Sequence, residues 1–238
     1  MECFLAEPEE ISGEHVALKG DEYRHLSRVL RKRIGDHVFV TDGKGRMYEV
    51  IIRSFTRTEA QCSIVQMLER WNEPRKDVTL AVSLLRNPAR FDLVVEKGTE
   101  LGATTIIPLL CERTVPKQEK HTRLEKIAVS ALKQCGRSIL PQIFVLTRFD
   151  TLVRNSDRYG LKVIAHEKTE QSQFLGSVMK HHDDTKSVLI VIGPEGGLTD
   201  DETALADEQG CIPVSLGPRR LRSETAAISA LSWVVGGW

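Results

Sequence analysis

Two glycine-proline turns in residues 187–227 carry most of the side chains that could do chemistry. The first, GPEGG at 193–197, places the acid Glu195 between glycines, and the second, GPRRLR at 217–222, carries three arginines. Glycine allows positive φ and lets a ligand approach the backbone closely, while arginine pairs with phosphates or carboxylates. A single turn of this kind is equally well explained as a tight strand-to-helix connection. Two in series favour a binding site.

The elements that must position these turns are two strands and two helices. Apolar residues 188–192 predict a strand buried on both faces, and the shorter run 212–216 predicts a second one. Thr199 and Glu202 have the spacing of a capping box, so a helix is expected to begin there, and Ser223 is the expected N-cap of another helix. Open α/β sheets bind ligands at the carboxyl ends of their strands, which is where both turns lie.

The turns lack the motifs of the common phosphate-binding folds. Neither is followed by G-K-[ST], and neither forms G-x-G-x-x-G. This argues against nucleotide triphosphatases and dinucleotide enzymes.

Composition is that of an ordinary globular protein of 238 residues with 33 basic and 33 acidic side chains. No apolar run approaches the roughly 18–20 residues that span a bilayer, and the first residues are not signal-like. Five scattered cysteines without C-x-x-C favour reduced thiols and argue against a zinc site or a disulfide framework. We therefore expect a cytoplasmic protein that needs neither a metal nor a membrane.

Residues 1–72 predict a small, strand-rich domain. Short runs at 37–41, 47–52 and 60–65 alternate with turns, and a helix is expected over 21–33. Residues 19–57 hold ten Lys/Arg against five Asp/Glu, within a neutral chain. A run of charge is often just a solvated face, but basic residues from several elements here could form one surface that contacts phosphates. The residues are Arg24, Arg28, Arg31, Lys32, Lys44 and Arg46.

Residues 73–238 predict an α/β domain with a mostly parallel sheet and helices on both faces. Strands are expected at 78–85, 104–110, 143–146 and 161–165, in addition to those that precede the two turns. Asn87 and Pro88 predict the start of a helix that Gly102 ends, and 122–134 predicts another. The last helix, 223–238, is apolar on more than one side, which suits burial by its own domain and by a partner subunit.

The segments IGPEGGLTDDE and LGPRRLRSETAA resemble the cofactor end of the SPOUT methyltransferases. Within that superfamily, VVEKGTELG and HLSRVLRKRIGD are similar to the ribosomal RNA small subunit methyltransferase E (RsmE) family. The resemblance implies a PUA-like β-barrel at 1–72 and a SPOUT domain at 73–238 that ends in a trefoil knot. It also implies a homodimer that uses S-adenosylmethionine to methylate N3 of a uridine in 16S rRNA. Chains rarely thread loops, so the knot follows from the resemblance alone.

The resemblance further assigns the residues of a cofactor pocket, formed by 165–167 and the two glycine-proline turns. The predicted cofactor-binding residues are Ala165, His166, Gly193, Pro194, Gly196, Gly197, Leu216, Gly217 and Leu221. A structural or solvated role is an equal alternative for His166.

Methylation at N3 requires the loss of the N3 proton, which spreads negative charge onto the neighbouring uracil oxygens. We expect Arg137, with Arg222, to stabilise this charge, and Glu195 or Glu224 to orient an arginine or to accept the proton. Arg137 lies in a segment similar to the family's E-Q-x-x-R, although Lys133 replaces the usual Glu. Cys135 is interpreted as structural, because N3 methylation needs no cysteine adduct.

Two alternatives remain open at this point. The chain could be another SPOUT enzyme that methylates tRNA or a ribose 2′-hydroxyl, or it could be an RNA-binding protein without catalytic activity.

Overall fold

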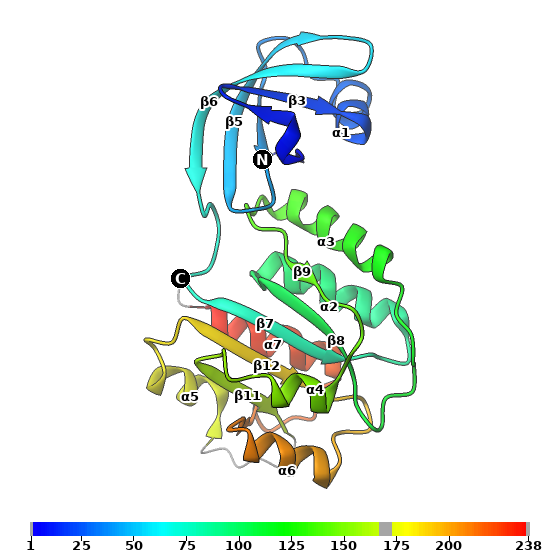
Figure 1. Cartoon of the computed structure of the whole chain (residues 1–238), viewed down its shortest axis with the longest axis vertical. Coiled ribbons are helices and arrows are strands. Elements are labelled where there is room, and N and C mark those ends of the chain that lie inside the picture. The colour runs from blue at the N-terminus through cyan, green and yellow to red at the C-terminus, as the bar shows by residue number, and fades with distance from the viewer. Residues whose placement is uncertain (1, 167–172, 237–238) are drawn as a thin grey trace. The chain divides into compact units, whose positions relative to one another are not determined.

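The computed structural model describes residues 2–166 and 173–236, and the chain divides into two compact units (Figure 1). Unit 1 contains residues 2–73 and 129–140, and unit 2 contains the described parts of 74–128 and 141–236. Residues 129–140 follow the predicted boundary at 72/73 in sequence but pack with unit 1 in space.

Unit 1 is built on a six-stranded sheet in the order β1-β4-β5-β6-β3-β2. Only β1 and β4 pair in parallel, and the other neighbours are antiparallel. Alternate residues of its strands, such as Val38 and Val40 on β4, point into one apolar core. The strands are β1 (Cys3–Leu5), β2 (Ile11–Ser12), β3 (His15–Lys19), β4 (His37–Thr41), β5 (Arg46–Phe55) and β6 (Glu59–Glu69), and a 3-10 turn, η1, covers Pro8–Glu10.

The helical segment of unit 1 is shorter than the sequence predicts. It comprises α1 (Gly20–Arg24) and the π-helical turn η2 (His25–Val29). The prediction that the helix continues to residue 33 is therefore wrong, because the helical segment ends at Val29. Arg31 adopts a left-handed φ of 53°, which stops the helix. The Asp36 carboxylate then accepts the backbone N–H of Arg33 at 2.8 Å, so this stretch forms the turn into β4. Leu26 remains fully buried in the core of the unit.

Residues 129–140 are tied to unit 1 by a buried ion pair. The guanidinium of Arg137 donates from Nη2 to Oε2 of Glu73 at 2.6 Å, and neither side chain is more than 2% exposed. Oε1 of Glu73 accepts the backbone N–H groups of Ser138 at 2.9 Å and Ile139 at 2.8 Å. One carboxylate therefore fixes the chain that follows α3 (His121–Cys135).

Unit 2 contains a seven-stranded parallel sheet. Its main path runs β10-β8-β7-β12-β11-β13, and β9 pairs with β8. The strands are β7 (Asp77–Ser83), β8 (Thr105–Leu110), β9 (Gln142–Ile143), β10 (Thr147–Arg148), β11 (Leu161–Ala165), β12 (Ser187–Ile192) and β13 (Ile212–Val214). The strand predicted at 143–146 is thus replaced by two short strands, of which β9 ends at Ile143 and β10 begins at Thr147.

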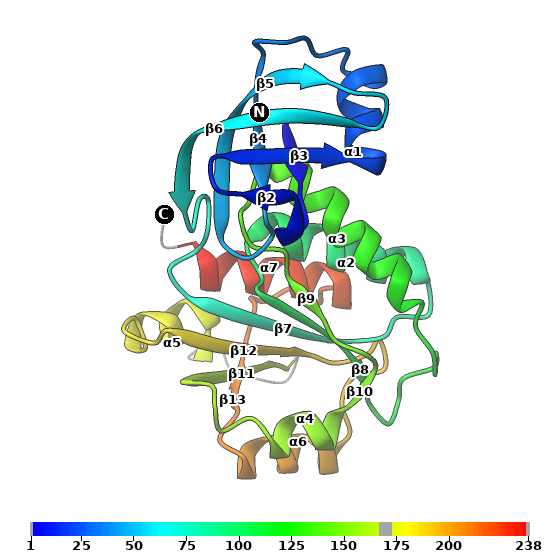
Figure 2. The ribbon, with the colours of Figure 1, turned by 45° about the horizontal axis from the view of Figure 1, so that its top comes forward.

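Helices cover both faces of this sheet, as Figure 2 shows with the strands seen nearly edge-on. α2 (Pro88–Leu101) and α7 (Ser223–Val235) lie on one side, and α4 (Phe149–Arg154) and α6 (Asp200–Glu208) lie on the other; α5 (Leu175–His181) packs against α7. Gly98 lets α2 approach the strands closely, because a Cβ there would stand 3.1 Å from Cδ1 of Ile106 and 3.4 Å from Cδ2 of Leu80.

The ends of the unit 2 helices mostly follow the predicted signals. Asn87 caps α2 by accepting the backbone N–H of Ala89, and Gly102 ends the helix with a φ of 110°. Thr199 and Glu202 form the predicted capping box of α6. The predicted N-cap at Ser223 is wrong by one residue: Arg222 holds the extended N-cap conformation, and Ser223 is already helical. No helix among the described residues is long and apolar enough to cross a membrane.

Candidate cofactor and substrate site

A cavity of about 810 Å³ lies at the carboxyl ends of β11, β12 and β13. β12 and β13 flank β11 in parallel register, so the two glycine-proline turns leave the same edge of the sheet, and Pro194 and Pro218 both line the cavity. Its walls comprise Arg90, Arg113, Ala165, His166, residues 192–198, Asp200, residues 214–223 and Ala226.

The first turn is held by hydrogen bonds on both sides. The N–H of Gly197 donates to the carbonyl of Pro194 at 2.9 Å, and Gly197 has a φ of 71°, which favours glycine. Nη1 of Arg113 donates to the carbonyls of Gly196 at 3.0 Å and Leu198 at 3.2 Å. Arg113 thereby supports the turn from the loop that follows β8.

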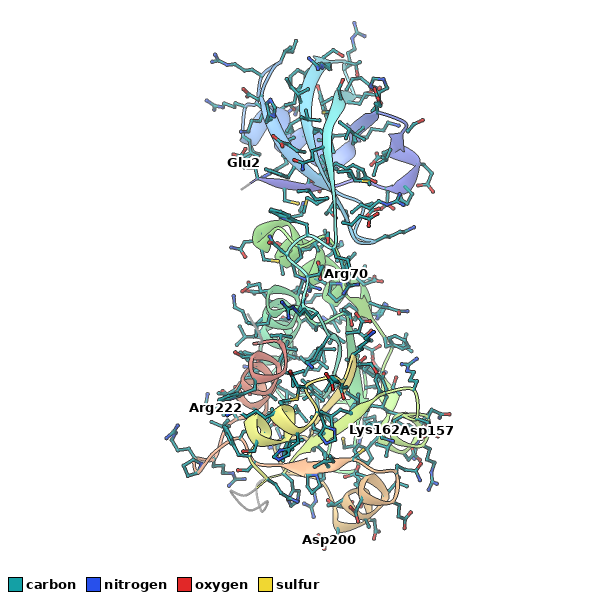
Figure 3. The ribbon with its side chains drawn as sticks, turned by 90° about the vertical axis from the view of Figure 1, so that its left-hand side faces the viewer. Glu2, Arg70, Asp157, Lys162, Asp200 and Arg222 are labelled. Atoms are coloured by element: carbon teal, nitrogen blue, oxygen red, sulfur yellow. The ribbon has the colours of Figure 1, made fainter. Side chains whose placement is uncertain are left out.

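The second turn depends on backbone conformation. Gly217 has a φ of 113°, and its N–H donates to Oγ of Ser215 at 3.2 Å. The N–H of His166 donates to the carbonyl of Val214 at 3.1 Å, so the end of β11 stays beside β13 up to the cavity. Figure 3 shows Arg222 on the segment that leads into α7 and Asp200 at the start of α6; both line the cavity.

The structure brings all nine predicted cofactor-binding residues together in the wall of this one cavity. Of the predicted catalytic residues, Glu195 and Arg222 also line it. Glu224 is buried, and its Oε1 lies 3.5 Å from Nε of Arg90, which is a wall residue. Glu167, which the resemblance adds to the pocket, lies outside the described residues.

Arg137 is the exception. It belongs to unit 1, where Glu73 already engages its guanidinium, and it is not among the residues that line the cavity. Its predicted catalytic role stays a prediction, and the role that the structure supplies is to hold residues 137–139 in place.

Five of the six predicted RNA-binding residues are exposed on unit 1, namely Arg24, Arg28, Arg31, Lys44 and Arg46. Lys32 is partly buried and forms an ion pair with Glu2. Arg24 pairs with Asp21 one helical turn away, so part of its charge is balanced locally.

Sequence reasoning missed two arginines of the wall, Arg90 and Arg113. A signal for Arg90 was present, because residues 86–90 follow a strand of the same parallel sheet and therefore emerge at its ligand-binding edge. Together with Arg219, Arg220 and Arg222, they bring the number of arginines in the described lining to five, whereas the acids in it are Glu195 and Asp200. This excess of positive charge favours an anionic partner. No cluster among the described residues could hold a metal ion.

Fold and site together define an RNA methyltransferase: residues 72–235 match the RNA methyltransferase domain family, and residues 18–65 match the RNA methyltransferase PUA domain. The chain is 34% identical to the ribosomal RNA small subunit methyltransferase E of Synechocystis sp., over 97% of this chain and 76% of that protein. The enzyme of the same name from Bacillus subtilis is 28% identical, over 91% of this chain and 88% of that protein. The chain belongs to the ribosomal RNA small subunit methyltransferase E family, which confirms the resemblance found in its sequence motifs.

A solved structure supports the same assignment. The ribosomal RNA small subunit methyltransferase E of Neisseria gonorrhoeae, bound to S-adenosyl methionine, superimposes with a TM-score of 0.88 at 29% identity, over 100% of this chain and 98% of that one.

Proposed function

We propose that this protein transfers a methyl group from S-adenosylmethionine to N3 of one uridine in 16S rRNA of the small ribosomal subunit, in the cytoplasm. The observation that carries the proposal is the single cavity at which both glycine-proline turns converge. The names of the relatives support methylation of small-subunit rRNA, and the neisserial structure supports the methyl donor.

The walls of the cavity fit S-adenosylmethionine. The described lining contains no lysine and is rich in glycine backbone and apolar side chains, which suits an adenosyl group without phosphates. Its volume lies within the roughly 300–1,000 Å³ typical of small-molecule sites. The nine residues from Ala165 to Leu221 named above would hold the donor. When bound, it supplies a methyl group already activated on a positively charged sulfur.

The remaining chemistry falls to the protein. A uridine must be unstacked to bring its N3 up to the donor, and holding it there lowers the entropic part of the barrier. The carboxylate of Glu195 accepts the N3 proton, which leaves a negative charge shared between N3 and the two flanking oxygens. The exposed guanidinium of Arg222 offsets that charge.

We also propose the finer features of the fold that the family resemblance implies. A trefoil knot is supported by the path of the chain, which leaves β13 at the sheet edge and returns as α7 to pack on the central strands β7 and β12. Closure of the unit 1 sheet into a PUA-like barrel is supported by its two register shifts in the β5–β6 pair, since bulges curl sheets. A homodimer is supported by Trp233 on α7, which is 50% exposed.

Methyl transfer can be tested with labelled S-adenosylmethionine and three acceptors: small-subunit particles, naked 16S rRNA and tRNA. We expect label in one or both ribosomal substrates, recovered as 3-methyluridine after digestion to nucleosides. Label in tRNA or at a ribose 2′-hydroxyl would instead assign the chain to another SPOUT activity. Absence of heat on titration with S-adenosylmethionine, together with no transfer, would leave an RNA-binding protein.

A further inference from the structure

A second hollow opens beside the cofactor cavity. It has a volume of about 460 Å³ and is lined by Arg86, Asn87, Arg90, Glu195 and Gly196. Arg90, Glu195 and Gly196 also belong to the wall of the cofactor cavity, so these three residues form the boundary between the two spaces.

Glu195 ties together two parts of the wall of this second hollow. Its Oε1 accepts the backbone N–H of Arg86 at 3.0 Å, which ties the turn after β12 to the connection between β7 and α2. The Arg86 side chain is exposed and the Arg90 side chain is 36% exposed, so both guanidiniums are accessible to a ligand.

Arg90 is held from behind by Glu224. Oε1 of Glu224 stands 3.5 Å from Nε of Arg90, while the side chain of Glu224 is only 8% exposed. Its other oxygen, Oε2, is buried and accepts no hydrogen bond from any described residue. A buried carboxylate without other partners depends on this guanidinium for its charge balance. Because the carboxylate contacts Nε, the terminal nitrogens of Arg90 are available to a ligand.

We propose that the second hollow receives the target uracil and that Arg90 is a catalytic residue, donating to a uracil oxygen as the N3 proton leaves. The inference rests on the proposed function. Glu224 is a positioning residue that keeps the Arg90 guanidinium oriented toward the second hollow. The proton passes from N3 to the carboxylate of Glu195, and the resulting negative charge on the uracil oxygens meets the Arg90 guanidinium.

The chemistry of the lining favours a uracil over the donor itself. The uracil edge presents a donor, N3–H, between two carbonyl acceptors. The shared wall offers the complementary set, a carboxylate at Glu195 and a guanidinium at Arg90. Because both belong to the boundary with the cofactor cavity, a base held by them has its N3 facing the donor side.

The test compares Arg90→Met and Arg90→Lys with wild type and with Arg123→Met. Arg123 is the matched control, since it is likewise paired with an acid on another helix, Asp92 of α2, but lines neither cavity. Thermal unfolding and titration with S-adenosylmethionine are measured first, to establish that each variant is folded and binds the donor. Methyl transfer to small-subunit particles isolated from cells that lack the enzyme is then measured across a range of pH.

We expect kcat of Arg90→Met to fall by about 10²–10³, as for the removal of one donor to a developing oxyanion, with KM for the particles little changed. Arg90→Lys should recover part of the rate because it retains the charge. The kcat of Arg90→Met should rise with pH over a range where the wild-type rate is level, since hydroxide then removes the N3 proton that Arg90 no longer acidifies. Added methylguanidine should restore part of its activity, and Arg123→Met should behave as wild type.

Particle binding without the methyl donor supplies an independent measurement. If Arg90 instead contacts an RNA phosphate, Arg90→Met will weaken binding, raise KM and reduce the salt dependence of binding while kcat stays the same, and this result overturns the proposal. Unchanged kcat and an unchanged pH profile would also overturn it. If wild type itself transfers no methyl group to the particles, the proposed function fails first, and that outcome is distinguishable from a failure of the role of Arg90.

Discussion

The carboxylate of Glu195 accepts the backbone N–H of Arg86 at 3.0 Å, across a gap of 109 positions in the sequence. This hydrogen bond joins the turn after β12 to the start of α2, the helix that carries Arg90. Because Glu195 lines both the cofactor cavity and the second hollow, a substitution of this residue can affect the chemistry, the shape of the wall, or both.

Glu195→Gln separates these effects, because glutamine can still accept the Arg86 N–H but cannot take up a proton. We expect kcat for methyl transfer to fall by about 10²–10⁴, the usual contribution of a positioned general base, with donor affinity nearly unchanged. Single-turnover kinetics and calorimetry with S-adenosylmethionine measure the two quantities. Glu195→Ala is the comparison, and it should also weaken donor binding. Full activity in Glu195→Gln with loss only in Glu195→Ala would reduce the role of Glu195 to holding the turn.

Glu73→Gln should destabilise unit 1, because it leaves the buried Arg137 guanidinium without its anionic partner. Breaking a buried pair by removing one partner costs about 3–5 kcal/mol. The free energy of unfolding from urea titration measures the loss, and Glu49→Gln, on a partly exposed carboxylate of β5, is the control.

Arg137→Ala extends this comparison to catalysis. A structural role predicts a loss of stability and of activity together in both Arg137→Ala and Glu73→Gln. If Arg137→Ala keeps its fold and its donor affinity but loses methyl transfer, the catalytic role predicted from the sequence is supported.

The strand and helix pattern of unit 2 was largely predictable from sequence, because buried parallel strands are continuous apolar runs and α2 and α6 carry strong caps. The convergence of both glycine-proline turns on one cavity followed from the same rule about sheet edges. The position of Arg90 at this edge could have been inferred from the same rule, but its pairing with Glu224 could not, because only the packing of α2 against α7 brings the two residues together.

The position of Arg137 was equally hidden. Its partner Glu73 precedes it by 64 positions, in a polar segment that reads as a linker. Sequence spacing gave no sign that residues 129–140 return to unit 1. The π-helical turn at His25–Val29 was also unpredictable from the helical stripe, since it depends on the burial of Leu26 and on the left-handed Arg31.

Buried thiols make the stability of the fold sensitive to high pH. Burial raises the pKa of Cys3 and Cys111 from 9.0 to about 12, and that of Cys62 from 9.0 to about 11. Above pH 9 the unfolded chain loses these protons while the folded chain retains them, so the free energy of unfolding falls as pH rises, by roughly 1 kcal/mol per pH unit for each thiol. Cys111→Ala should show a shallower fall between pH 9 and pH 11 than wild type. The free energy of unfolding is measured by urea titration at each pH, and an equal dependence on pH in the variant and the wild type would contradict this prediction.

Exposed arginines on the helical segment of unit 1 should contribute to RNA affinity but not to chemistry. Arg28 is exposed, and no ion pair is found for it among the described residues. Arg148 on unit 2 differs, because its Nε and Nη2 both donate to the carboxylate of Asp150 at 3.0 Å. Replacing Arg28 by Ala should weaken binding to small-subunit particles and lower the slope of log K against log salt by about one if it contacts one phosphate. Arg148→Ala is the control, and it should leave the slope unchanged. Filter binding at several salt concentrations measures the slope, and kcat at saturating particle concentration should be the same for both variants. A loss of kcat in Arg28→Ala, with an unaltered salt slope, would show that the basic face of unit 1 does more than position the RNA.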